Sequence, residues 1–481
     1  MKKYIIILIS IFLFNSSFAQ EFKTEVGSSF KKENEQEVYQ IVFPSAYGFM
    51  TLHHIDNVMM DNTKAMTLTK YDQAMQSIES LTFNLPKMGA RAADLAKVIE
   101  LEDRLIVISD AMEKRSGKHE IYAQVYSLTE NTVSERKVLA SFPIDGYSKS
   151  GFYNVSVSPD KSKIAVFANL PYIKKTQEKV MISVYDNSLN VLWEQSETLK
   201  YDSKRSYQEN TFVLNSGDVV LNKISDAFKK TRKSELLKFN GNTVETNDFS
   251  SAGFQPMNMK LIDVNGSPML AGFYWYGKSA VVKINPKEGN DNDGAFLYDI
   301  NSKTLIGIHE WTENLDAKDL KSLEVIAIKV VNDDIFMIGE KYLENSEFRK
   351  NGSTTTTDMD YFYTYGSSVI VNFDTKGTLK GFENFMNSKK YKNDAKEKGS
   401  FATMFLNDGL RLFSNNDYIR LDSYFTEEES TFMSPSVKPN GTGSNSTPYV
   451  IPKTVREVNN YNLVYYITNY GNEYWLNKMT W

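Results

Sequence analysis

The sequence predicts an all-β protein built from repeated antiparallel hairpins. Three observations support this fold class. The apolar runs are short and rich in Val, Ile, Tyr and Phe, which is typical of strands. Asn, Asp, Gly and Ser separate these runs, as tight turns require. Only residues 88–99 and 314–323 have a helical pattern, and both stretches are brief.

One recurring pattern, here called the outer hairpin, is a strand that ends in an aromatic residue, then a turn with Asp or Asn, then a second strand. It occurs six times, and the aromatic residues that end the first strand are Tyr71, Tyr126, Tyr185, Phe239, Tyr298 and Phe373. Four of the five intervals between them are 54 to 59 residues long, and the last is 75. The long interval contains residues 344–360, where we expect an inserted polar loop.

A second pattern, the inner hairpin, precedes each outer hairpin and consists of two apolar strands joined by a polar turn. The expected turns are 102–103, 158–161, 215–218, 265–266 and 332–334. The same spacing counted back from Tyr71 leads to residues 44–48, where we expect one more such turn. A last inner hairpin is expected over residues 404–413.

An inner and an outer hairpin together make a four-stranded antiparallel sheet, and repeats of about 40–60 residues of this kind build β-propellers. One such sheet cannot bury enough apolar surface alone, so neighbouring sheets must pack together. We predict a single propeller domain over residues 37–481, with seven blades that begin near 37, 97, 152, 208, 257, 322 and 400. The last blade takes its outer hairpin from 450–481, after a polar loop near 433–448. If the hairpin 64–85 pairs with 401–413 instead, there are six blades.

The segment 155–167 reads Val-Ser-Val-Ser-Pro-Asp-Lys-Ser-Lys-Ile-Ala-Val-Phe. It resembles the strand, Ser-Pro-Asp turn and strand of the TolB-like and WD40-like propellers of bacteria. Lys161 and Ser162 follow Asp160 where that family usually has Gly, and one repeat carries the match. The resemblance implies a secreted propeller of the binding or scaffold type, and it transfers no functional residue.

The first 19 residues have the pattern of an export signal. Lys2 and Lys3 precede the apolar run 4–14, and small residues precede a cleavage point expected after Ala19. The apolar run is shorter than the roughly 20 residues that span a bilayer, and no later segment approaches that length, so we expect no transmembrane helix. We expect a periplasmic or extracellular protein, with association to the outer membrane left open, and a lead segment at residues 20–36.

The composition removes several classes of function. The chain has no cysteine, which excludes disulfides, thiolate metal sites and a cysteine nucleophile. Loss of Lys2 and Lys3 with the signal leaves 53 basic and 60 acidic side chains, a formal net charge of −7, so nucleic acid is not an expected partner. His53 and His54 would point to opposite faces of a strand, and no G-x-S-x-G motif is present. We therefore name no catalytic residue.

Two aromatic clusters contain the candidate ligand-binding residues, which are Tyr274, Trp275, Tyr276, Tyr361 and Tyr363. Rigid amphipathic rings at a loop mouth are typical of surfaces that bind glycans, peptides or proteins. Packing between blades is the alternative interpretation.

The run 290–294 resembles the first half of a calcium loop, with Asp291 and Asp293 as ligands. Position 300 is Ile where a full EF-hand loop has Glu, so a solvated turn is the alternative. No other cofactor is expected.

The sequence thus predicts an exported, non-enzymatic propeller that binds a protein or a glycan. The export signal, the blade-length repeats and the lack of a recurring catalytic motif support this interpretation. One alternative is a glycoside or peptide hydrolase with carboxylates in the central channel, which 60 acidic residues leave open. The other is an outer-membrane β-barrel, suggested by the Tyr-rich end and the terminal Trp481.

Overall fold

The computed structural model describes residues 23–31, 36–57, 63–146, 151–202, 206–225, 233–249, 254–276, 293–311, 323–350, 357–385, 389–392, 400–406, 409–414, 417–421, 427–432, 449–458, 461–470 and 473–480. Within these residues, one turn of 3₁₀ helix at Pro452–Thr454 is the only helical segment. No described helix is long and apolar enough to cross a membrane.

The helical pattern expected at residues 88–99 is wrong. This stretch forms the short strands β6 (Lys87–Met88) and β7 (Arg91–Ala92) and most of β8 (Asp94–Glu100). Its apolar residues recur at a helix-like spacing, but they are buried in a hairpin and an inner strand, where Ile99 pairs with Ile106. Of the second stretch, Leu323 begins a strand and 314–322 lie outside the described residues.

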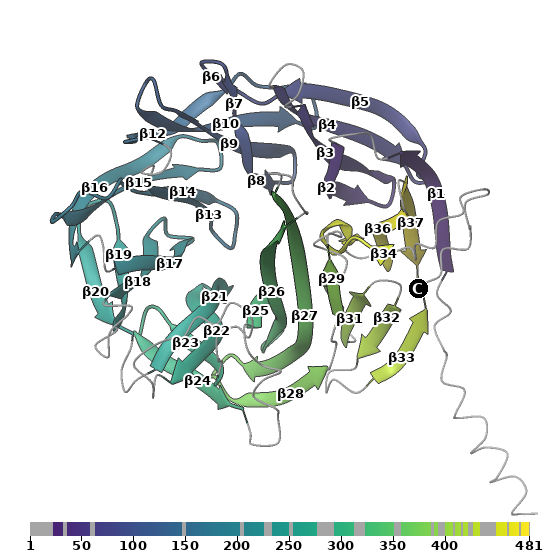
Figure 1. Cartoon of the computed structure of the whole chain (residues 1–481). Coiled ribbons are helices and arrows are strands. Elements are labelled where there is room, and N and C mark those ends of the chain that lie inside the picture. The colour runs from purple at the N-terminus through teal and green to yellow at the C-terminus, as the bar shows by residue number, and fades with distance from the viewer. Residues whose placement is uncertain are drawn as a thin grey trace, which may run out of the picture.

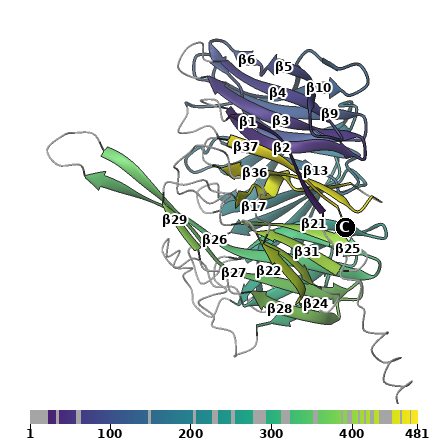
Figure 2. The same cartoon turned by 90° about the vertical axis from the view of Figure 1, so that its right-hand side faces the viewer.

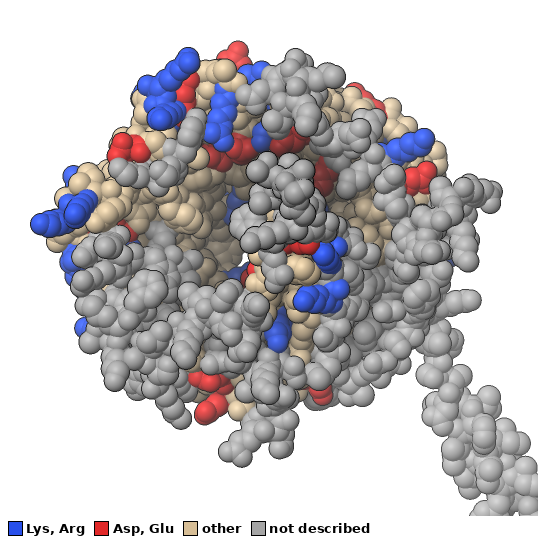
Figure 3. Space-filling model, in the orientation of Figure 1, with Lys and Arg blue, Asp and Glu red and all other residues tan. Residues whose placement is uncertain are grey.

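The strands form separate antiparallel sheets in a ring (Figure 1), and the ring is hollowed at its centre (Figure 3). Seven of the sheets are blades whose four main strands follow one another in the chain. Their first strands, nearest the centre, are β2 (Gln36–Ser45), β8, β13 (Phe152–Val157), β17 (Ser206–Val213), β21 (Phe254–Val264), β25 (Leu323–Val331) and β30 (Phe401–Leu406). Each begins within three residues of its predicted start, so the predicted all-β propeller with four-stranded blades is confirmed.

The other three strands of each blade lie progressively farther from the centre. The second strands are β3 (Gly48–Asn57), β9 (Arg104–Glu113), β14 (Lys163–Asn169), β18 (Val219–Ser225), β22 (Ser267–Tyr276), β26 (Asp334–Lys350) and β31 (Gly409–Ser414). The third are β4 (Thr63–Asp72), β10 (Lys118–Ser127), β15 (Gln177–Asp186), β19 (Lys233–Phe239), β23 (Gly294–Asp299), β27 (Thr357–Asp374) and β32 (Asp417–Leu421). The fourth are β5 (Ser77–Asn84), β12 (Lys137–Pro143) with the short β11 (Thr132–Val133), β16 (Val191–Asp202), β20 (Val244–Asp248), β24 (Thr304–Glu310), β28 (Leu379–Phe385) and β33 (Glu427–Phe432).

An eighth sheet, here called the closing sheet, joins the two ends of the chain. It consists of β34 (Tyr449–Val450), β35 (Arg456–Val458), β36 (Leu463–Tyr470), β37 (Glu473–Thr480) and the N-terminal β1 (Lys23–Lys31). The expectation that 450–481 supplies the outer hairpin of the seventh blade is wrong, because β32 and β33 already complete that blade. The six-blade alternative is also wrong, because β4 pairs with β3 and β5 pairs with β4, so both belong to blade 1.

The six predicted aromatic anchors all lie at the end of a third strand and are buried. At Tyr71, Tyr185, Tyr298 and Phe373 the pairing with the fourth strand skips one residue, which forms the same β-bulge in four blades. The acidic residue that follows the anchor then shapes the turn. Asp374 Oδ1, for example, accepts hydrogen bonds from the backbone N–H groups of Lys376 at 2.9 Å and Thr378 at 2.7 Å. The Asp or Asn of the repeat is therefore an Asx turn that ends the strand.

The apolar core consists of clusters between neighbouring sheets. One of them joins Phe273 and Leu297 of blade 5 to Met337 and Val371 of blade 6. Gly339 lets these blades approach, since a Cβ there would lie 2.4 Å from Cζ of Phe273. Each blade thus buries apolar surface against its neighbour, which it could not do alone.

The second and third strands of blade 6 are much longer than those of the other blades and stand clear of the ring (Figure 2). They pair from Asp334↔Asp374 to Lys350↔Thr357, with one shift of register between Glu340 and Tyr342. The short strand β29 (Lys389–Lys392) pairs with β27 near the ring. The part beyond Lys341, here called the arm, replaces most of the polar loop expected near 344–360. The second expected loop, 433–448, lies outside the described residues.

Candidate functional site

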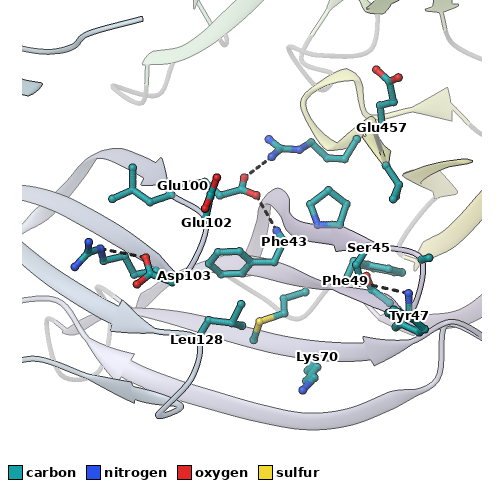
Figure 4. A pocket seen from close by; sticks show the side chains of 18 of the residues that line it. Phe43, Ser45, Tyr47, Phe49, Lys70, Glu100, Glu102, Asp103, Leu128 and Glu457 are labelled. Carbon is teal, nitrogen blue, oxygen red and sulfur yellow. Dashed lines mark hydrogen bonds and ion pairs between the residues drawn. The ribbon is translucent and has the colours of Figure 1, made fainter. Parts of the chain in front are cut away.

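A cavity of about 1370 Å³ opens at one end of the ring. It lies among the turns that join the first and second strands of blades 1, 2 and 3 and of the closing sheet (Figure 4). The turns predicted at 44–48, 102–103 and 158–161 thus meet at one site. They meet because the first strands are the innermost strands of a propeller, so the turns that follow them surround its central axis.

Exposed apolar side chains form the rim of this cavity. Tyr47 is 82% exposed in the turn between β2 and β3, and Tyr461 is 57% exposed in the turn before β36. The Tyr47 turn is fixed by Ser45, whose Oγ accepts from the N–H of Tyr47 at 3.3 Å and donates to the carbonyl of Gly48 at 2.9 Å. Gly48 is required there, because its φ is +142° and a Cβ would lie 2.0 Å from the carbonyl oxygen of Tyr71. The ring of Tyr47 is therefore presented by a well-defined turn.

Glu100 organises the wall of the cavity. Its carboxylate accepts a hydrogen bond from the N–H of Phe43 at 2.9 Å and forms an ion pair with Arg456 of the closing sheet. Its backbone carbonyl accepts from Nζ of Lys161 in blade 3 at 2.9 Å. Residues of three sheets thus converge on Glu100 of blade 2, and Figure 4 shows its contact with Phe43.

Other carboxylates in the cavity differ in how they are held. Asp103 pairs with the neighbouring Arg104 at 3.3 Å. Asp160 accepts hydrogen bonds from the hydroxyls of Ser158 and Ser162. Burial raises the pKa of Asp160, but these hydrogen bonds outweigh it, and the pKa is lowered overall. The cavity therefore presents negative charge in fixed positions while Arg104 and Arg456 are held by carboxylates.

Glu457 lies on the closing-sheet side of the cavity (Figure 4). Burial raises the pKa of its carboxyl group, and the positive charge of Lys329 opposes this rise in part. A carboxyl group with a raised pKa is more readily protonated than an ordinary carboxyl group, and such a group can donate a hydrogen bond to a ligand.

The structure separates the two predicted aromatic clusters from this cavity. Tyr274 is fully buried between blades, where its ring stacks on Phe254 at 4.9 Å between centroids. Trp275 is partly buried, and the side chain of Tyr276 lies outside the described residues. Tyr361 and Tyr363 lie on the arm, where Tyr361 is 41% exposed and Tyr363 is partly buried. Packing between blades therefore accounts for Tyr274, whereas Tyr361 and Tyr363 belong to the arm.

The histidines lie outside the cavity. His53 and His119 are buried, and His54 and His309 are partly buried. At the other end of the ring from the cavity, His119 Nε2 lies 2.8 Å from Asp110 Oδ2, and the hydroxyl of Tyr153 donates to Asp110 Oδ1 at 2.6 Å. This cluster joins blades 2 and 3, and burial together with the negative charge of Asp110 raises the pKa of Tyr153. Its buried position favours a structural role.

The calcium hypothesis stays a prediction. Asp291 lies outside the described residues, and Asp293 lies just before β23, where its N–H donates to the carbonyl of Tyr274 at 2.8 Å. Among the residues that the structure describes, no three His, Asp or Glu side chains are grouped so that they could hold a metal ion.

Sequence reasoning located the turns that line the cavity but named none of their residues as a site. The missed residues are Tyr47, Glu100, Arg456, Glu457 and Tyr461. The available signal was the tyrosine inside a turn of polar and small residues at 44–48, where a large ring has no core to enter. The link between Glu100 and Arg456 had no sequence signal, since it joins residues 356 positions apart.

Comparison with known proteins identifies no family for this chain. No family model and no curated protein matches the chain. Similar solved structures include an acylaminoacyl peptidase from Pyrococcus horikoshii, at 10% identity over 90% of this chain and 57% of that chain with a TM-score of 0.40. The WD40 domain of SCAP from fission yeast is 7% identical over 95% of this chain and 98% of that one, with a TM-score of 0.37. The N-terminal domain of Nup159 is 9% identical, with coverages of 96% and 97% and a TM-score of 0.37. Likenesses this distant carry no argument about function.

Proposed function

We propose that the protein is an exported binding propeller that holds a segment of a protein or a glycan in the cavity among the inner turns. The observation that carries this proposal is the combination of an open cavity of about 1370 Å³ with the exposed rings of Tyr47 and Tyr461 at its rim. Exposed rigid aromatic residues beside fixed polar groups are characteristic of recognition surfaces. A volume above the usual 300–1,000 Å³ of small-molecule sites favours a larger ligand.

The charges of the cavity narrow the class of ligand. Arg104 and Arg456 are paired with carboxylates, and Lys161 donates to a backbone carbonyl. Glu102 and Lys70 are both exposed in the same cavity. A ligand rich in hydroxyl and amide groups therefore fits these mixed charges better than a strongly anionic or cationic one.

Substitution of the rim tests the proposal. The mature chain is screened on immobilised arrays of neutral glycans and of peptides, and Tyr47→Ala and Tyr461→Ala are compared on the ligands that the wild type retains. We expect each variant to lose at least tenfold in affinity, about 1.4 kcal/mol. Tyr172→Ala is the matched control, since Tyr172 is exposed in the turn between β14 and β15 at the other end of the ring. Equal losses for all three variants, or no retention of the wild type, would contradict the proposal.

Export is tested separately. Expression of the full chain in a bacterial host, followed by N-terminal sequencing of the protein from the periplasm and the medium, should give a chain that begins at Gln20. A protein that keeps residues 1–19 and stays in the cytoplasm would contradict export and leave the binding proposal in place.

A hydrolase is the second candidate, favoured by Glu457. An acid with a raised pKa in a ligand cavity is a suitable proton donor. Any retained glycan or peptide is therefore incubated with the wild type and with Glu457→Gln. Turnover by the wild type that Glu457→Gln lacks would make the protein an enzyme.

A further inference from the structure

The arm carries one face that is unusually rich in tyrosine. The register of β26 and β27 places Tyr342 opposite Tyr365, Glu344 opposite Tyr363 and Ser346 opposite Tyr361. Residues directly opposite one another point to the same side of a sheet, and so do residues two positions apart along a strand. Tyr342, Tyr361, Tyr363 and Tyr365 therefore share one face of the arm with Glu344 and Ser346. The arm is a two-stranded ribbon except at residues 362–365, where β29 adds a third strand.

Exposure on this face increases away from the ring. Tyr365 is buried at the base, where its ring lies 5.2 Å from that of Tyr342. Tyr363 is partly buried, and Tyr361 and Met359 are exposed farther out. Lysine side chains cover part of the opposite face. Nζ of Lys390 and Nζ of Lys392 lie over the ring of Phe362, at 5.0 and 5.5 Å from its centroid. The arm that carries this face extends away from the ring (Figure 2).

Two other uses of the arm, pairing with a further strand and binding a folded protein, fit its structure less well. Five of the ten residues in Lys341–Lys350 are charged, and such charges on an edge strand disfavour the addition of a further strand. The ribbon beyond the ring is about 30 Å long and about 10 Å wide, so its face offers roughly 300 Å², well under the 800 Å² or so that each partner contributes to a stable protein interface. A thin linear ligand matches these dimensions better than a folded protein or a second copy.

We propose that the tyrosine face of the arm binds a linear neutral glycan. The tyrosine rings would stack on the C–H faces of successive sugar rings, and Glu344 and Ser346 would hydrogen-bond to their hydroxyls. Glu344 disfavours an anionic glycan through like-charge repulsion. This surface is separate from the cavity of the proposed function. The arm extends the end of the second strand of blade 6, whereas the cavity lies where the second strands of blades 1, 2 and 3 begin.

Affinity electrophoresis tests the proposal with the full mature chain in gels that contain hydroxyethylcellulose, galactomannan or arabinoxylan. We expect the wild type to be retarded in at least one gel. Tyr361→Ala and Tyr363→Ala should each raise the dissociation constant at least tenfold, whereas Tyr361→Phe keeps the stacking ring and should stay within about threefold. Phe362→Ala is the matched control on the opposite face and should stay within about twofold. Circular dichroism and thermal melting confirm that each variant is folded.

Several results would overturn the proposal. One is free migration of the wild type in all three gels. Another is an equal loss of affinity in Phe362→Ala and Tyr361→Ala, since this would show that the substitutions act by disturbing the structure of the arm. Loss of retardation in Tyr47→Ala and Tyr461→Ala with none in the arm variants would assign the glycan to the cavity and support the proposed function instead. A change of mass by light scattering in Tyr361→Ala would show that the face is a contact between copies of the chain.

Discussion

The guanidinium of Arg456 is paired with the carboxylate of Glu100 and so connects the closing sheet to blade 2 across the intervening blade 1. The N–H of Phe43 in blade 1 donates to the same carboxylate at 2.9 Å. One side chain therefore holds three consecutive sheets of the ring together at the cavity. The contact that shapes the candidate site also helps to close the ring.

Arg456→Met should lower the free energy of unfolding by about 2 kcal/mol, because the largely buried carboxylate of Glu100 loses its cation but remains desolvated. Urea denaturation at pH 7 measures this change. Lys453→Met is the matched control in the same sheet, since its ion pair with Glu37 at 3.4 Å is more exposed and should contribute under about 0.5 kcal/mol. If the two variants lose equal amounts of unfolding free energy, the ion pair of Arg456 contributes no more than an exposed ion pair, which would contradict the prediction.

A second prediction concerns the strand that closes the ring. Gly27 of β1 lies against blade 1, where a Cβ on it would stand 2.4 Å from Cβ of Met75. Gly27→Ala should push β1 away from blade 1 and cost about 1–3 kcal/mol through overpacking. Limited proteolysis should then release the N-terminal strand sooner than in the wild type. Ser29→Ala, at an exposed position of the same strand, should leave both measurements unchanged, and an unchanged Gly27→Ala would contradict the prediction.

The repeat could be predicted because its signals are local. Tyr185 and Asp186 are adjacent, and their roles as a buried anchor and a turn acceptor depend on their own strand, where Asp186 Oδ1 accepts from the N–H of Ser188 at 2.9 Å. Strand type, turn position and blade start all follow from such neighbours. The closing sheet could not be predicted in this way, since it pairs Lys23 with Thr480.

The candidate site was less predictable than the fold for the same reason. Tyr274 and Tyr361 have similar aromatic neighbours in sequence, yet one is buried between blades and the other is exposed on the arm. The difference arises from the length of the hairpin, which carries Tyr361 beyond the reach of the next blade. The residues of the cavity come from four sheets, and only closure of the ring brings them together.

Glu457→Gln should stabilise the protein at pH 8. The raised pKa of Glu457 means that the folded state binds a proton more tightly than the unfolded chain. The stability contributed by the protonated group is therefore present below the unfolded pKa of about 4.3 and lost as the pH rises through the folded pKa. The melting temperature of the variant should exceed that of the wild type at pH 8 and approach it at pH 4. Glu102→Gln is the control, because Glu102 is exposed in the same cavity; a gain in melting temperature at pH 8 as large as that of Glu457→Gln would contradict the prediction.

His53 makes the opposite contribution to the pH dependence. It is 3% exposed, Thr51 Oγ1 lies 2.8 Å from its Nε2, and the ring of Phe30 from β1 packs edge-on against it at 5.1 Å. Burial lowers the pKa of His53 to about 4, so between this value and the ordinary value of about 6.5 the unfolded chain binds the extra proton. The stability that neutral His53 contributes is therefore fully present above about pH 6.5 and is lost as the pH falls toward 4.

The expected loss from this one group between pH 7 and pH 4 is about 3 kcal/mol. Urea denaturation at pH 7, 5.5 and 4 should therefore show a steeper decline for the wild type than for His53→Gln, whose side chain does not titrate. His54→Gln is the control, because His54 is only partly buried and burial lowers its pKa against the opposing charge of Asp56. If His53→Gln and the wild type lose stability in parallel, His53 is not the group whose protonation loosens the contact between β1 and blade 1.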